Sequence, residues 1–102
     1  AFARAIQRFA QGRAIFENER AFRQLGQLYQ NIGAAYGAKA VAQKAQALPS
    51  RAKESYAGAL DAFEQCAAQG AAQPDDKTLT GLIVATCARQ RALAQKKLSE
   101  LK

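Results

Sequence analysis

The chain has 102 residues, of which 49% are hydrophobic and 23% charged, and its formal net charge is +7. This length suits a single domain with one core, and the apolar runs are far shorter than the roughly 20 residues that a membrane-spanning helix needs. The sequence has no histidine, tryptophan or methionine, so the commonest general base and metal ligand is missing and the core must rely heavily on alanine.

Residues 2–32 carry two helical series of large apolar residues, each with a spacing of seven. The series are Phe2, Phe9 and Phe16, and Ile15, Phe22 and Tyr29. Because the second series is displaced by one position, either one long helix changes its buried face near 12–18, or the chain breaks at Glu17-Asn18, where Asn18 could cap a new helix. No proline interrupts this region, so we favour one long, bent helix.

Two glycines predict the first turn, at Gly33 and Gly37, because glycine ends helices easily in the left-handed conformation. A short second helix would follow to about residue 47, with a face of small residues formed by Ala38, Val41, Ala42 and Ala45. Pro49 would stop this helix, since the residue before proline is biased away from the helical region. Ser50 is a suitable N-cap for the next helix.

The C-terminal half reads as a helical hairpin whose two arms are joined by residues 73–76. The first arm begins at Arg51 and the second follows Asp75-Asp76, two acids that suit the positive end of a helix dipole. The apolar stripes of the arms are Tyr56, Ala59/Leu60, Phe63 and Cys66/Ala67, and Leu79, Leu82/Ile83, Thr86/Cys87, Gln90, Leu93/Ala94, Leu98 and Leu101. Strand patterns are nearly absent. The sequence therefore predicts an all-α fold, a small antiparallel bundle of about four helices that occupies 1–102 as one domain.

The two cysteines, Cys66 and Cys87, lie on the inward stripes of the hairpin and are candidates for a disulfide. Bridged Cα atoms lie within about 7 Å of each other. If the first arm ends at Gln69, the two residues differ in height by about 10 Å; if it continues past Gly70 to Gln73, the difference falls to about 4–5 Å. A bridge therefore requires a helix that continues past Gly70, and the alternative is a pair of buried free thiols.

No arrangement of residues in the sequence indicates catalysis, and we expect neither an enzyme nor a bound cofactor. Two cysteines without histidine do not match a zinc site. The acid pairs Asp61/Glu64 and Asp75/Asp76 are explained by a solvated helix face and a helix start. The two glycines at 33 and 37 follow no strand, so they do not form a phosphate-binding loop.

Basic residues occur in long stretches without acids, and they form the predicted partner-binding surface. The candidates are Arg4, Arg8, Arg13, Arg20, Arg23, Arg89, Arg91, Lys96 and Lys97. Such a surface favours acidic protein subunits or membrane headgroups as partners, and it is also compatible with a merely solvated surface. Nucleic acid is less favoured, because the aromatic residues near these arginines belong to the core stripe and are not available for stacking on bases.

One segment resembles a tetratricopeptide repeat. The matching positions are Phe22, Leu25, Gly26, Tyr29 and Gly33, followed by Ala38, Ala45 and Pro49, and a second match runs from Tyr56 through Ala59, Leu60 and Phe63 to Cys66. The two matches do not keep the 34-residue register of that family, and the large residue expected near Ala42 is missing. The resemblance implies stacked helical hairpins and an adaptor role.

These observations predict a non-enzymatic accessory or structural subunit that binds within a larger protein assembly, peripheral to an organellar (respiratory or photosynthetic) or bacterial membrane complex. The alternatives are a free-standing, tetratricopeptide-like adaptor and a non-specific nucleic-acid-binding protein. The chain begins Ala1-Phe2-Ala3 without an initiator methionine, so we expect either a trimmed fragment or a mature product whose targeting peptide was removed. With a disulfide, the expected location is an organelle lumen, an intermembrane space or a periplasm.

Overall fold

Four helices run back and forth in the computed structural model, which describes residues 2–19 and 21–101, without the side chains of 2, 3, 16, 18 and 19. Helix α1 spans Phe2–Glu19, α2 Phe22–Ala45, α3 Pro49–Ala72 and α4 Ala85–Glu100, and a π-helical segment, η1, spans Leu79–Val84 and leads directly into α4. The described residues contain no strand. The predicted all-α fold and the small bundle of four helices are confirmed.

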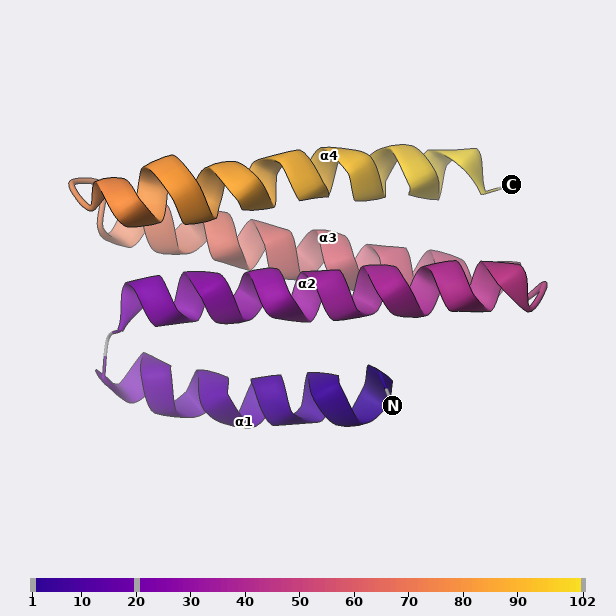
Figure 1. The fold of residues 1–102 in the computed structure, drawn as a ribbon, viewed down its shortest axis with the longest axis horizontal. Helices are drawn as coiled ribbons and strands as arrows, with labels where there is room; N and C mark the ends of the chain where they lie inside the picture. The colour runs from indigo at the N-terminus through magenta and orange to yellow at the C-terminus, as the bar shows by residue number, and fades with distance from the viewer. Residues whose placement is uncertain (1, 20, 102) are drawn as a thin grey trace.

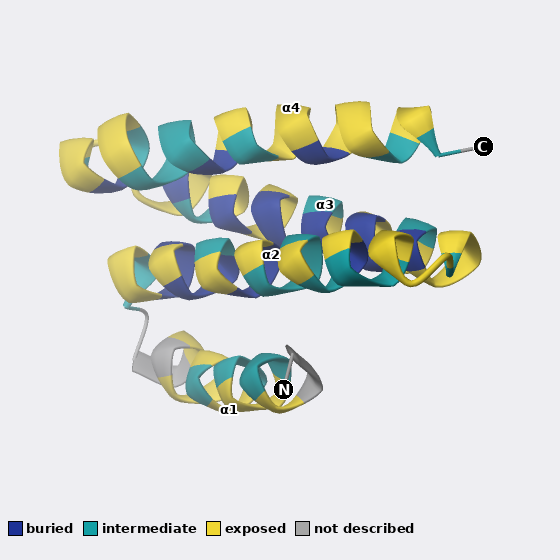
Figure 2. Ribbon diagram, turned by 45° about the vertical axis from the view of Figure 1, so that its right-hand side comes forward, coloured by how far each residue is buried: buried dark blue, intermediate teal, exposed yellow. Residues whose placement is uncertain are grey.

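Consecutive helices are antiparallel and lie in the order of the sequence from α1 to α4 (Figure 1). Helix α3 packs against α2 on one side and α4 on the other, and α1 packs against α2. The Cα atoms extend over 43 × 25 × 14 Å, so the bundle is flat. Figure 2 shows the buried residues gathered on α2 and α3, whereas the described residues of α1 are of intermediate or full exposure.

The core combines a few large side chains with alanines at the closest helix contacts. The buried large residues are Leu25, Leu28, Tyr29, Ile32, Tyr56, Phe63 and Leu79. Ala40, Ala52 and Ala59 are fully buried beside them. The alanines allow α2 and α3 to approach closely, and the core is thin, as the composition predicts.

The preferred prediction of one long helix over 2–32 is wrong, because the chain breaks between α1 and α2 and reverses direction. The break follows Glu19, two residues beyond the predicted alternative, and the N-cap of α2 is Ala21, not Asn18. The first series lies in α1, whereas the second straddles the break, with Ile15 in α1 and Phe22 and Tyr29 in α2. Phe9 and Phe22 pack against the core, while Ile15 is 58% exposed, so Ile15 does not belong to a buried stripe.

The predicted turn at Gly33 and Gly37 is also wrong, because α2 continues through both glycines to Ala45 and there is no separate short helix. A Cβ added to Gly33 would collide with the ring of Phe63. Close packing of α2 on α3 at this point outweighs the low helix propensity of glycine, which costs about 1 kcal/mol. The turn comes at residues 46–48, where Ala47 has a φ of 58°.

Pro49 does separate two helices, as predicted, but it is the first residue of α3 and not a residue of the preceding loop. Proline suits this position because its missing N–H would have no partner in the first turn of a helix. The N-cap is Leu48, so the predicted capping role of Ser50 is wrong.

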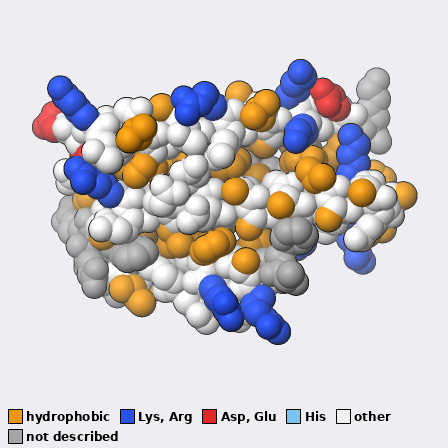
Figure 3. All heavy atoms as spheres, in the orientation of Figure 1, with side chains coloured by type: hydrophobic (Ala, Val, Ile, Leu, Met, Phe, Trp, Pro, Cys, Tyr) orange, Lys and Arg blue, Asp and Glu red, His pale blue; other side chains and the backbone are white. Residues whose placement is uncertain are grey.

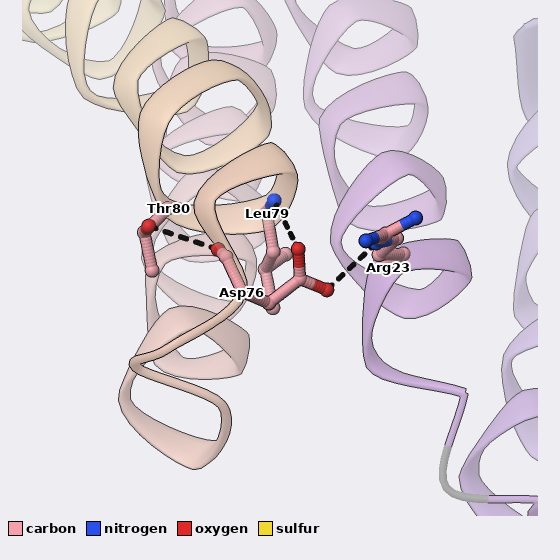
Figure 4. A network of polar contacts seen from close by, with 4 residues as sticks. All are labelled: Arg23, Asp76, Leu79 and Thr80. Atoms are coloured by element: carbon pink, nitrogen blue, oxygen red, sulfur yellow. Dashed lines mark hydrogen bonds and ion pairs between the residues drawn. The ribbon is translucent and has the colours of Figure 1, made fainter.

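The predicted C-terminal hairpin is present, and its second arm begins with a capped π-helical turn. The backbone N–H of Leu79 donates to Asp76 Oδ1 at 3.1 Å, and the Thr80 hydroxyl donates to the Asp76 carbonyl at 2.9 Å (Figure 4). Leu79 and Cys87 are both fully buried. In a regular α-helix residues eight apart differ by about 80° around the axis; the extra residue in a π turn reduces this offset and turns both side chains inward.

Candidate functional site

An open groove runs between α2 and α4, with α3 as its floor. Its volume is about 250 Å³. Tyr56 and Phe63 of α3 lie at the bottom, and the walls are formed by Gly33, Ala34, Gly37, Ala38 and Val41 of α2 and by Gln90, Leu93, Ala94 and Lys97 of α4. The groove exists because α2 and α4 both pack on α3, while the described residues of α2 and α4 make few contacts with each other.

The wall on α2 is low because its residues are small and recur every three or four positions, which places them on one helix face. Nothing would lie within 4 Å of a Cβ added to Gly37, so the surface of α2 is open there. The face of small residues predicted for 38–45 is thus real at Ala38 and Val41, although it belongs to a longer helix.

Two large apolar side chains on opposite walls face solvent. Val41 is 50% exposed and Leu93 is 60% exposed. Figure 3 shows hydrophobic side chains along the seam between α2 and α4, with lysine and arginine side chains over α4. Exposed apolar residues that border an apolar groove are typical of a surface that binds another protein.

Gln90 contributes an unsatisfied hydrogen-bond acceptor to the groove wall. Its Oε1 atom is buried and has no hydrogen-bond partner among the described residues. Buried polar atoms are nearly always paired, and an unpaired one carries the full cost of losing its water. Because the atom is buried by the chain itself, it lies inside the wall of the groove and not on its open surface.

Intramolecular ion pairs involve three residues of the predicted basic surface. Three of its members have acid partners: Arg23 lies 2.7 Å from Asp76, Arg91 2.7 Å from Glu64 and Arg13 3.8 Å from Glu17. Asp76 and Glu64 lie 53 and 27 residues from Arg23 and Arg91, so the runs of basic residues could not reveal these two pairs. Arg23 and Arg91 are therefore paired with acids, whereas the runs of basic residues in the sequence suggested that both would be unopposed.

The remaining basic candidates lie on two separate helices. Arg4 and Arg8 are exposed on α1, and Arg89, Lys96 and Lys97 are exposed on α4. None of these five makes an ion pair with a described residue, although Arg89 donates to the Thr86 hydroxyl at 3.1 Å. Of the five, Lys97 lines the groove; the predicted residue Arg20 lies outside the described residues.

The cysteines meet the geometric condition set by the sequence. Helix α3 continues past Gly70 to Ala72, the Cα atoms of Cys66 and Cys87 are 6.4 Å apart, and their sulfur atoms lie at disulfide-bonding distance. Both residues are fully buried. The pair therefore crosslinks α3 to α4 below the surface and does not border the groove.

One acid of each predicted pair, Asp76 and Glu64, has a structural partner, and so does Glu17. The hydrogen bond from Arg23, together with the N–H of Leu79, lowers the pKa of Asp76. Glu64 pairs with Arg91. On α1, Glu17 accepts a hydrogen bond from the Tyr29 hydroxyl at 3.2 Å, and burial of Tyr29, with Glu17 nearby, raises the pKa of that tyrosine.

The described residues contain no group of three or more potential metal-ligating side chains that could hold an ion. Within the same residues, none of the helices combines the length and the hydropathy needed to cross a bilayer.

Comparison with protein-family models, with curated proteins and with solved structures gives no match to this chain. The fold does not contain the tetratricopeptide repeat that the sequence resembles. Such a repeat is a helix–turn–helix of 34 residues, whereas the matching segment from Phe22 to Ala45 forms one uninterrupted helix.

Proposed function

We propose that this protein is a non-enzymatic accessory or structural subunit that binds a partner protein within a larger assembly, and that the groove between α2 and α4 is its binding surface. The observation that carries the proposal is the apolar groove itself, with Val41 and Leu93 half-exposed on its two walls. Leaving such a surface open to water is unfavourable, and covering it with a partner stabilises both chains.

The size of the groove favours a protein over a small molecule. Its volume of about 250 Å³ lies below the roughly 300–1,000 Å³ of typical ligand pockets. An open groove of this volume can take a few side chains from a partner that continues beyond it on both sides.

We further propose that the host assembly is an organellar (respiratory or photosynthetic) or bacterial membrane complex, to which the protein is peripheral. The basic residues on α1 and α4 would then face acidic subunits or lipid headgroups. The cysteine pair at bonding distance favours an oxidising compartment such as an organelle lumen, an intermembrane space or a periplasm.

The test compares two leucine substitutions at glycines that have open space around them. Gly37→Leu fills the groove, and Gly81→Leu adds the same side chain on η1, away from the groove; a Cβ at either position meets nothing within 4 Å. Tagged chains are purified under native conditions from the cells that normally contain them, and circular dichroism checks that both variants are helical.

The proposal predicts a stoichiometric complex that the wild-type chain and Gly81→Leu retain and that Gly37→Leu loses. If the wild-type chain is a monomer without a stoichiometric partner, the subunit proposal is wrong. If Gly37→Leu keeps the whole complex, the groove is not the binding surface.

A further inference from the structure

Resting on the proposed function, we infer that the occupant of the groove is an acidic amphipathic α-helix with a carboxylate opposite Lys97. Two features of the groove lead to this inference: its length and backbone chemistry, and the cations at one end of it.

The first feature favours a helix over an extended peptide. The lining residues cover Gly33–Val41 on α2 and Gln90–Lys97 on α4, a length of about 10–12 Å or two helical turns. The backbone groups of both walls are already bonded within their own helices. An extended peptide would therefore bury unpaired N–H and C=O groups, whereas a helix satisfies its own.

The small residues on α2 allow this helix to approach closely. Packed helices lie about 8–10 Å apart, with the shorter distances at small residues. Because Gly37 is open and Gly33 and Ala34 precede it by one turn, apolar side chains of the occupant can extend over α2 towards Tyr56 and Phe63. The occupant thus presents an apolar stripe.

The second feature is the charge at one end of the groove. Helices α2 and α4 run in the same direction (Figure 1), so Lys44, in the last turn of α2, lies at the same end as Lys97 in the last turn of α4. Lys97 is the one charged side chain among the lining residues, and the exposed Lys96 is next to it. Complementary charge favours a carboxylate on the occupant at this end.

The experiment uses the full chain and three designed helical peptides that share one face of alanine and leucine. At the end that would lie beside Lys97, the peptides carry glutamate, lysine or alanine. Binding is measured by fluorescence anisotropy against the wild-type chain, Gly37→Leu and Lys97→Glu. We expect the glutamate peptide to bind about tenfold more tightly than the lysine peptide, Lys97→Glu to reverse that order, and Gly37→Leu to abolish binding.

Equal affinity for the glutamate and lysine peptides, or no binding of the glutamate peptide at about 1 mM, would overturn the acidic helix. Phosphatidylglycerol vesicles and a short DNA duplex are tested in parallel. If these bind the wild-type chain while no peptide does, the inference is also overturned.

These outcomes are distinct from those of the proposed function. A native complex that depends on Gly37 but is indifferent to Lys97→Glu would leave the groove as a protein-binding surface and exclude the acidic occupant. Absence of any native complex would contradict the subunit role itself.

Discussion

Arg23 and Asp76 join the start of α2 to the start of η1, although 53 residues separate them in sequence. The Nε of Arg23 donates to Asp76 Oδ2 at 2.7 Å, while the other carboxylate oxygen, Oδ1, accepts the N–H of Leu79 (Figure 4). One carboxylate therefore caps η1 and connects it to α2. This contact fixes the end of the bundle opposite the Lys44 and Lys97 end of the groove.

The Arg23–Asp76 contact predicts a loss of stability in acid. Because the hydrogen bond from Arg23 lowers the pKa of Asp76 in the folded state, the contact contributes stability above the unfolded pKa of about 3.9. This contribution is lost as the pH falls through the lower, folded-state pKa. Asp76→Asn retains an oxygen for the Leu79 N–H but loses the charge, so its melting temperature should be lower than that of the wild type at neutral pH and approach it below about pH 4.

Thermal melts from neutral pH to strong acid measure this difference. Asp75→Asn serves as the neighbouring control, since Asp75 makes no ion pair with a described residue. If the difference in melting temperature between Asp76→Asn and the wild type stays constant over the whole pH range, the charge of Asp76 does not cause that difference.

Two glycines of α2 should respond to alanine in opposite directions. Gly33→Ala places a methyl group against the ring of Phe63, and we expect it to lower the free energy of unfolding by about 1–3 kcal/mol, as overpacking does. Gly37→Ala has open space and should raise that free energy by about 0.5–1 kcal/mol, because alanine favours the helix. Urea titrations compare the two variants, and destabilisation by Gly37→Ala would contradict the continuous α2.

The cysteine pair predicts a crosslink within the chain. Iodoacetamide should add no mass to Cys66 or Cys87 in the unfolded, unreduced protein and two labels after reduction. Two labels without reductant would exclude the bridge. Because the residues are 21 apart, replacing both by serine should lower the free energy of unfolding by about 3 kcal/mol; urea unfolding with and without reductant measures this.

Gln90→Leu should stabilise the isolated protein. It removes a buried acceptor that has no partner among the described residues, and we expect a gain of about 1 kcal/mol in the free energy of unfolding. Gln95→Leu, at an exposed position of the same helix, is the control and should change stability little. If Gln90→Leu loses stability, the glutamine side chain stabilises the folded chain even without a partner.

The sequence predicts the helices from local patterns and misses what depends on distant packing. The stripes of the hairpin predict its two arms, and simple helix geometry links the cysteine pair to the continuation of α3 past Gly70. The turn at Gly33 is a wrong prediction because its outcome depends on Phe63, which lies 30 positions later in the sequence.

The groove could not be predicted from the sequence for a similar reason. Its floor and walls come from three helices, and each stripe alone only identifies a buried or an exposed face. The small residues at 38–45 and the basic run at 96–97 are visible in the sequence, but only the parallel directions of α2 and α4 place them at one groove.

The order of the helices in space has a consequence for how the chain reaches its fold. Because each helix packs mainly on the next one in the sequence, most contacts close short loops, and proteins of such low contact order fold in microseconds to milliseconds. Disulfide formation takes seconds to hours. Folding should therefore bring the sulfur atoms of Cys66 and Cys87 together first, and oxidation then locks an arrangement that already exists.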